Sequence, residues 1–219
     1  MVFEPINLEI ELKSHTFDNM SKAVIIGDII KSREQKAGSW IENLKKVLSQ
    51  YGNPPSVWEI FRGDSFQLML DPIDALLAAI HIRAFMKHSD SLDVRMAIGI
   101  GEVTHKAAKI TESNGSAFVF SGECFESLKK QTLALKTGDQ EIDLTLNVML
   151  KLALLTIDNW TPKVAGVIKT ALEQPKSYQK DIARLLGTTQ SNISETLNRG
   201  GFYEIMQMND FYRNKISSL

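Results

Sequence analysis

The stretch Ala23-Val-Ile-Ile-Gly-Asp-Ile-Ile30 decides the fold class of the first part of the chain. Its residues are almost all apolar and several are β-branched, a composition typical of a short strand buried on both faces. The one charged residue, Asp28, falls late in this stretch. We therefore expect a first strand that is buried on both faces and carries a carboxylate near its end.

The segments that follow alternate between helical and strand patterns. The predicted elements are a helix over 40–51, strands over 57–61 and 66–70, a helix over 75–85 and a strand over 94–103. Residues 62–65, Arg-Gly-Asp-Ser, form the turn between the two short strands. This order is that of the βαββαβ unit, an antiparallel sheet with two helices on one face. The predicted fold class is α+β, with a ferredoxin-like first domain.

The rest of the chain is expected to be mostly helical. A helix over 116–131 and a short strand over 133–136 come before Ile142–Asp158, which is apolar enough for a buried connecting helix. The predicted parts are an N-terminal extension over 1–21, an α+β domain over 22–140, a connecting helix over 141–159 and an all-α domain over 160–219.

The segment Gln179–Asn198 has the layout of a helix-turn-helix. Ala183 is small where two helices cross, Gly187 supplies a positive φ after the first helix, and Thr188 or Thr189 caps the second. The residues expected in the shared core are Ile182, Leu186, Ile193 and Leu197. Residues 161–172 predict the supporting helix, and the aromatic residues after 201 predict a closing wing or helix.

Charge and polar residues make DNA the expected partner of this C-terminal domain. Residues 160–219 hold 8 Lys/Arg against 5 Asp/Glu, whereas residues 1–159 hold 17 against 21. The residues expected to contact DNA are Lys180, Thr189, Gln190, Ser191, Asn192, Glu195, Asn198 and Arg199. The alternative is that the same fold serves as a protein interaction or packing module.

Two carboxylates point to a metal site at one end of the predicted sheet. Asp28 lies late in the first strand and Asp64 lies in the turn of the neighbouring hairpin, so the two acids are expected at the same end of the sheet, where they can bind Mg²⁺. Gly27 and Gly63 beside them leave room for a phosphate. The alternative is structural, because Asp residues commonly cap turns and hairpins.

Three sequence fragments, two of which contain these acids, resemble a known family of catalytic domains. Gly27-Asp-Ile-Ile-Lys-Ser-Arg33, Phe61-Arg-Gly-Asp-Ser-Phe-Gln67 and Ala97-Ile-Gly-Ile-Gly-Glu102 resemble the class III nucleotidyl cyclase catalytic domain and its GGDEF relatives. The resemblance implies a class III cyclase-like domain, Asp28 and Asp64 as Mg²⁺ ligands, and a purine nucleotide as ligand. The nucleotide-binding residues it implies are Gly27, Ser32, Arg33 and Gly63.

The whole chain is more similar to the bacterial SatD family. That family shows a GD-[IV]-x-x-SR segment near its start, a G-x-AF segment like Gly115-Ser-Ala-Phe118 and a C-terminal helix-turn-helix, so the resemblance covers residues 22 to about 205. In class III cyclases an Asn and an Arg support the transition state. The matching positions are Val119, expected to be buried, and Glu123, neither of which stabilises phosphoryl charge.

Composition sets the remaining expectations. With 219 residues, 43% hydrophobic and a formal net charge of −1, the chain is typical of a soluble globular protein. No apolar run approaches the roughly 18 residues of a membrane span, and no secretory signal is visible, so a cytoplasmic protein without a membrane partner is predicted. A homodimer is expected because the class III cyclase domains that the chain resembles work as dimers, and operators of helix-turn-helix proteins are often palindromic. The function expected is that of a DNA-binding transcriptional regulator with a nucleotide-binding, catalytically degenerate cyclase-like domain. An active Mg²⁺-dependent nucleotidyl cyclase or nucleotidyltransferase and an interaction scaffold are the alternatives.

Overall fold

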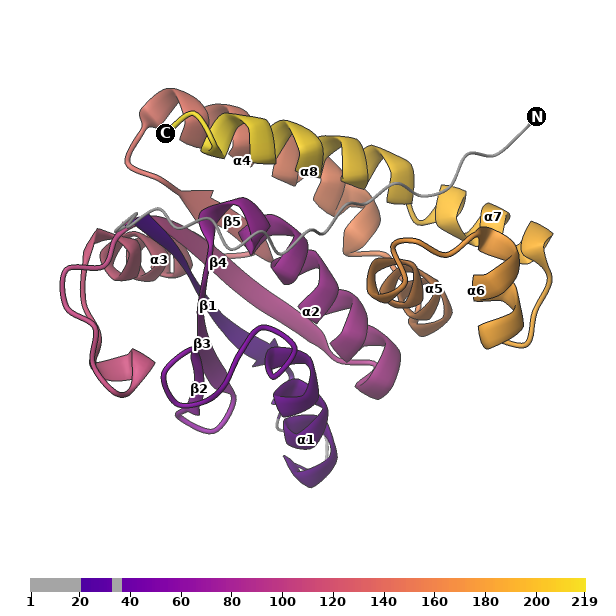
Figure 1. Cartoon of the computed structure of the whole chain (residues 1–219), viewed down its shortest axis with the longest axis horizontal. Helices are drawn as coiled ribbons and strands as arrows, with labels where there is room; N and C mark the ends of the chain where they lie inside the picture. The colour runs from indigo at the N-terminus through magenta and orange to yellow at the C-terminus, as the bar shows by residue number, and fades with distance from the viewer. Residues whose placement is uncertain (1–20, 33–36) are drawn as a thin grey trace.

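The computed structural model describes residues 21–32 and 37–219, and within them it contains one five-stranded sheet and eight α-helices (Figure 1). The strands are β1 (Ser21–Ile30), β2 (Trp58–Phe61), β3 (Ser65–Leu70), β4 (Asp93–Glu102) and β5 (Leu133–Lys136). The helices are α1 (Ala37–Leu48), α2 (Ala75–Asp90), α3 (Ser116–Ser127), α4 (Gln140–Ile157), α5 (Pro162–Glu173), α6 (Gln179–Leu185), α7 (Gln190–Arg199) and α8 (Phe202–Ile216). The N-terminal extension up to residue 20 and Arg33 lie outside the described residues.

The sheet has the order β2-β3-β1-β4-β5, which places β1 at its centre. β1 pairs antiparallel with both β3 and β4, β2 pairs antiparallel with β3, and β5 is added parallel to β4. The α+β class is therefore confirmed. The central position of β1 explains its apolar composition, because both of its edges and both of its faces are covered by protein.

The two faces of the sheet are covered by different helices. Alternate β1 residues such as Ile25 and Ile29 belong to the main core with α1 and α2, whereas Val24 packs with residues of α3 on the opposite face. Gly27 lies on the main-core face, where an added Cβ would come within 2.6 Å of the Phe66 ring. The lack of a side chain at Gly27 therefore serves core packing, which differs from the expected role of admitting a phosphate.

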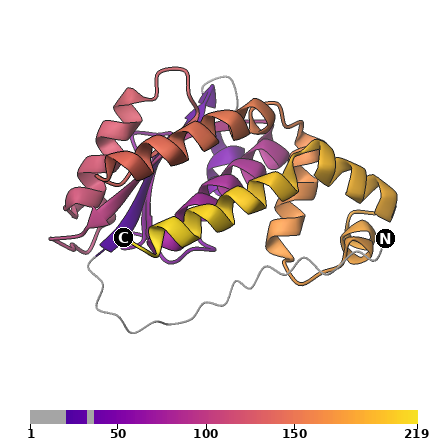
Figure 2. The same ribbon diagram turned by 90° about the horizontal axis from the view of Figure 1, so that it is seen from above.

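The C-terminal helices pack directly on the first part of the chain. α5 lies against α2, and α8 runs back beside α4 and contacts the 3-10 turn Pro72–Asp74 (Figures 1 and 2). There the Tyr212 hydroxyl donates to the Pro72 carbonyl at 2.5 Å and Arg213 pairs with Asp74 at 2.9 Å. One continuous cluster of buried apolar residues spans both parts.

A buried polar chain also joins α2 to α5. The His81 ring lies 2.6 Å from the Tyr51 hydroxyl through Nδ1 and 3.2 Å from Glu173 through Nε2, and Lys169 pairs with the other Glu173 oxygen at 2.6 Å. Burial raises the pKa of Glu173, but the hydrogen bonds and charges of His81 and Lys169 outweigh burial and lower this pKa to about 2. Glu173 is therefore ionised at neutral pH and holds α5 against α2.

Two local expectations from the sequence are wrong, and of the two alternatives for the end of the chain the helix is the one observed. α4 is amphipathic rather than buried, because Leu146 and Leu150 face the core while Leu144 and Leu152 are exposed. Leu186 is 39% exposed instead of belonging to the core, since the chain leaves α6 at this residue and turns at Gly187. The segment after residue 201 is the helix α8, and no strand occurs in residues 160–219, so the winged alternative is excluded there.

Candidate functional site

The first candidate site lies where β1 ends beside the β2–β3 hairpin, and Asp28 is engaged there by an arginine. Asp28 stands opposite Ser65 of β3 on one side and Arg95 of β4 on the other. Arg95 donates two hydrogen bonds to it, from Nη2 to Oδ2 at 2.6 Å and from Nε to Oδ1 at 3.2 Å. The guanidinium also lies 4.8 Å from the centre of the Phe125 ring of α3. The bidentate pair and the ring fix the orientation of Arg95.

Asp64 is held by a different partner in the same region. The Ser32 hydroxyl donates to Asp64 Oδ2 at 2.6 Å, and the Ile29 amide donates to the Asp64 carbonyl at 3.1 Å. These bonds tie the loop after β1 to the hairpin loop, so the two acids lie in neighbouring segments as the sequence predicts. We call this region, comprising Asp28, Ser32, Arg62–Asp64 and Arg95, the sheet-end site.

In the sheet-end site the Asp28 carboxylate is engaged by an arginine, and Mg²⁺ binding by Asp28 and Asp64 stays a prediction. Mg²⁺ prefers carboxylate oxygens as ligands, and both oxygens of Asp28 already accept from Arg95. Within residues 21–32 and 37–219, no three His, Cys, Asp or Glu side chains are grouped so as to hold a metal ion. A cation at Asp28 would compete with a bidentate arginine for this carboxylate.

The two loops of the sheet-end site, one after β1 and one between β2 and β3, contain residues with positive φ values. Lys31, Arg62 and Gly63 have φ values of 61°, 51° and 89°, in the left-handed region that glycine tolerates best. An added Cβ at Gly63 would meet nothing within 4 Å, so Gly63 faces open space, and the Lys31 and Arg62 side chains are also exposed. Two loops with cationic side chains thus border the Ser32–Asp64 contact.

Helix α3 supplies nothing that would support phosphoryl transfer at the aligned positions. Val119 is 49% exposed, so the expectation that it is buried is wrong, and Glu123 forms an exposed ion pair with Lys136 at 2.6 Å. The α3 residue that does reach the site is Phe125, through Arg95. A sequence search could have found the Asp28–Arg95 pair only by predicting the register of β1 and β4.

The second candidate site is formed by α6, α7 and the loop between them. Ile182, Ala183, Ile193 and Leu197 are buried, and Gly187 has a φ of 61°. Thr189 precedes α7, and its hydroxyl accepts from the Asn192 amide at 3.3 Å. The chain therefore turns and caps α7 by the residues that the sequence indicates.

All eight residues expected to contact DNA are exposed. They are Lys180, Thr189, Gln190, Ser191, Asn192, Glu195, Asn198 and Arg199. Lys176 and Arg184 are exposed as well, and Arg184 pairs with Asp181 only at 3.4 Å. We call the exposed residues of Lys176–Arg184 and Thr189–Arg199 the α6–α7 surface. It offers amide and hydroxyl groups on one helix and basic groups beside it, which are the group types that contact base edges and phosphates.

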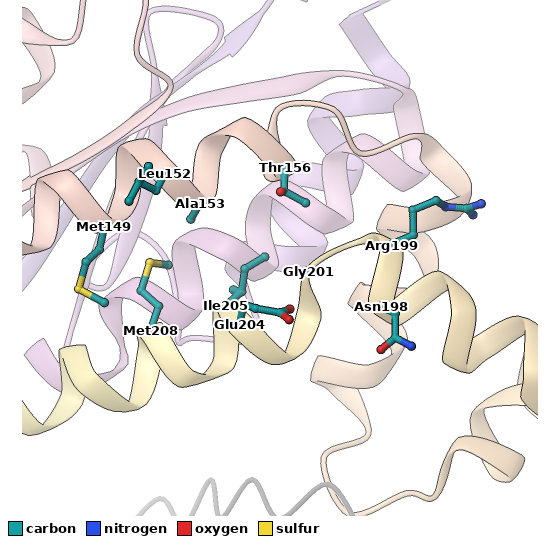
Figure 3. A pocket seen from close by; sticks show the side chains of 10 residues that line it. All are labelled: Met149, Leu152, Ala153, Thr156, Asn198, Arg199, Gly201, Glu204, Ile205 and Met208. Carbon is teal, nitrogen blue, oxygen red and sulfur yellow. The ribbon is translucent and has the colours of Figure 1, made fainter.

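An open groove of about 490 Å³ between α4 and α8 was not predicted from the sequence. Figure 3 shows Met149, Leu152 and Thr156 of α4 along one side and Glu204 and Met208 of α8 along the other. At one end the lining includes Asn198 and Arg199 of α7, so the groove borders the α6–α7 surface. Two helices that diverge along an apolar contact leave such a groove, and periodicity alone does not place them side by side.

A comparison with models of known protein families identifies the family of the chain. The SatD family model matches residues 22–209, which includes both candidate sites. The chain belongs to the SatD family. No curated protein matches this SatD-family chain. Among its described helices, none has the length and apolar character required to span a membrane.

Proposed function

We propose that this SatD-family chain is a DNA-binding regulator that places α7 in the major groove and binds a nucleotide at the sheet end. The observation that carries the first part is the α6–α7 surface, on which every candidate base-contacting side chain is exposed while the turn and the core beneath it are well packed. A glycine turn and a capped second helix are features of a helix-turn-helix. Thr189, Gln190 and Asn192 lie at the start of α7, the part of a recognition helix that meets base edges.

DNA binding is tested with a random-sequence 30-bp duplex library selected on the full-length protein, followed by gel shifts of the enriched duplexes. Replacing Gln190 with alanine removes a donor and an acceptor from α7 without touching its cap, so we expect affinity for the selected duplex to fall roughly tenfold or more. Lys180→Ala should weaken all duplexes alike and lower the salt slope by about one.

The matched control for these variants is Gln207→Ala, because Gln207 is an exposed glutamine on α8, outside the α6–α7 surface. It should leave the affinity unchanged. Failure to enrich any duplex, or equal effects of the Gln190 and Gln207 substitutions, would contradict the DNA proposal and leave the interaction scaffold.

The nucleotide part of the proposal is that cationic side chains, and not a metal centre, receive the phosphates. Arg62 and Lys31 border the open side of the site, and Arg95 keeps Asp28 neutralised. Calorimetric titration of ATP and GTP into the full-length protein should give binding without Mg²⁺ that Arg62→Ala weakens at least tenfold, since a charge-assisted contact is lost. Lys22→Ala, at the opposite end of β1, is the control.

Two outcomes would contradict the phosphate assignment. If neither ATP nor GTP gives a heat of binding, the sheet end does not bind nucleotide and has only a structural role. Nucleotide binding that requires Mg²⁺ and disappears in Asp64→Ala would mean that the carboxylates coordinate a cation, with Asp28 released from Arg95. In that case product formation that Asp28→Asn abolishes would establish the nucleotidyl cyclase or nucleotidyltransferase alternative.

A further inference from the structure

Helix α4 carries an apolar stripe on the side facing away from the core, and none of the described residues covers it. Its members are large side chains that are 48–71% exposed, namely Leu144, Val148, Leu152 and Leu155. The spacing of four, four and three residues places them along one side of the helix. Contiguous exposed apolar surface on a folded protein marks an interaction site. We call these four residues the α4 stripe.

The α4 stripe is continuous with the groove between α4 and α8. Leu152 belongs to the stripe and also lines the groove, and Met149 and Met208 extend the apolar surface toward α8 (Figure 3). The surface therefore consists of one projecting row and one recess beside it. A partner that fits it must itself present an apolar row.

We propose that the α4 stripe is the contact surface for a second copy of this chain, with the two α4 helices antiparallel across a two-fold axis at Val148. An isologous contact needs a surface that is complementary to itself under a two-fold rotation. Leu144 and Leu152 stand four residues before and four after Val148. In this pairing each Leu144 faces Leu152 of the partner subunit and the two Val148 residues face each other, so these three of the four stripe residues match themselves.

Charges at the ends of the stripe favour the same pairing. Glu141 is exposed in the acidic first turn of α4. With the axis at Val148, Glu141 of the partner subunit falls opposite Leu155. The next residue, Thr156, lines the groove together with Arg199, which is exposed and forms no ion pair with any described residue. The antiparallel arrangement thus brings an acid of one copy to an arginine of the other at both ends of the contact.

The geometry gives a test by disulfide formation. At the usual helix separation of about 8–10 Å and with Cα atoms about 2.3 Å from each helix axis, the two Cα atoms of a residue on the two-fold axis are about 3.4–5.4 Å apart, which overlaps the range of a disulfide. Two Leu144 residues would be displaced by about 12 Å along the axis, which is too far. The native Cys124 is 5% exposed, and burial raises the pKa of its thiol to about 12, so it does not compete.

The experiment is oxidation of three single variants of the full-length protein, read on non-reducing gels. Val148→Cys should form a covalent dimer almost completely, while Leu144→Cys and Leu152→Cys should each remain monomeric when oxidised alone. A mixture of the Leu144→Cys and Leu152→Cys proteins should form the covalent heterodimer. In sedimentation, Leu152→Glu should be monomeric at micromolar concentrations at which the unmodified protein is a dimer.

Three results would overturn the proposal. They are a monomeric unmodified protein at these concentrations, a dimer that Leu152→Glu leaves intact, and efficient self-crosslinking through Leu144→Cys with none through Val148→Cys. The inference goes beyond the proposed function and does not depend on it, because neither readout involves DNA or nucleotide.

Discussion

Replacing Arg83 with methionine is expected to lower the free energy of unfolding by about 3 kcal/mol, the lower end of the range for removing one partner from a buried ion pair, because its partners Asp93 and Asp158 are 23% and 43% exposed. Arg83 lies on α2 and is 1% exposed. Its guanidinium donates to both Asp93 oxygens at 2.7 and 2.8 Å and pairs with Asp158 at 2.7 Å. Thr132 accepts the remaining bond at 2.9 Å. The methionine would fill most of the volume, but Asp158 would lose its cation and Asp93 would keep only Lys87.

The Lys87 ammonium, which is the second cation near Asp93, cannot take over the contacts of Arg83. Lys87 bonds Asp93 at 3.0 Å and the Asp158 carbonyl at 2.7 Å, so its ammonium is already engaged. Burial raises the pKa of Asp93, but Arg83 and Lys87 outweigh burial and hold this pKa below its usual value. A lowered carboxyl pKa contributes stability that is present above its usual pKa and is lost as acid protonates the group. Part of the Arg83 effect should therefore vanish in strong acid.

Urea unfolding followed by circular dichroism measures the Arg83 effect. The matched control is Arg184→Met, because Arg184 is 80% exposed and pairs with Asp181 at 3.4 Å on the surface. An exposed pair of this kind contributes about 0–1 kcal/mol. Similar unfolding midpoints for the two variants would show that the buried network is not what joins α2, β4 and the end of α4.

The Arg83 centre also marks the limit of prediction from sequence. Its partners lie 10 and 49 residues away along the chain at Asp93 and Thr132. Periodicity identifies α2 as a helix but carries no information about which distant loop meets it. Short-range features fared better, since β5 was predicted at 133–136 and lies there. A cap or a turn is decided by neighbouring residues, whereas an ion network is decided by the register of the whole sheet.

The sheet-end site and α4 show the same division. The hairpin turn and the glycine beside Asp64 follow from local residue preferences, but the pairing of Asp28 with Arg95 depends on the register between β1 and β4. In α4, apolar residues occur on both sides of the helix, so composition suggested full burial. Composition cannot separate a helix buried on all sides from one that keeps an apolar face for a partner. For this reason the α4 stripe could be identified from the structure but not from the sequence.

Replacing Gly99 with alanine is expected to lower the free energy of unfolding by about 3 kcal/mol, the upper end of the usual range for overpacking. A Cβ at Gly99 would lie 2.2 Å from the Ser121 amide nitrogen and 2.3 Å from the Ala117 carbonyl oxygen. Both atoms belong to the backbone of α3, so no side chain can move aside to make room. Helix α3 would have to shift from the sheet, and with it Phe125, on which Arg95 rests.

The control for Gly99→Ala is the same substitution within the helix that must move. A Cβ at Gly122 of α3 would meet nothing within 4 Å, and alanine favours the helix over glycine by about 1 kcal/mol. Gly122→Ala should therefore raise the urea midpoint while Gly99→Ala lowers it. If the same substitution lowers the urea midpoint at Gly99 and raises it at Gly122, then glycine is required at Gly99 because of the close contact between β4 and α3. A Gly99→Ala protein as stable as the unmodified one would mean that α3 is not seated on β4 this closely.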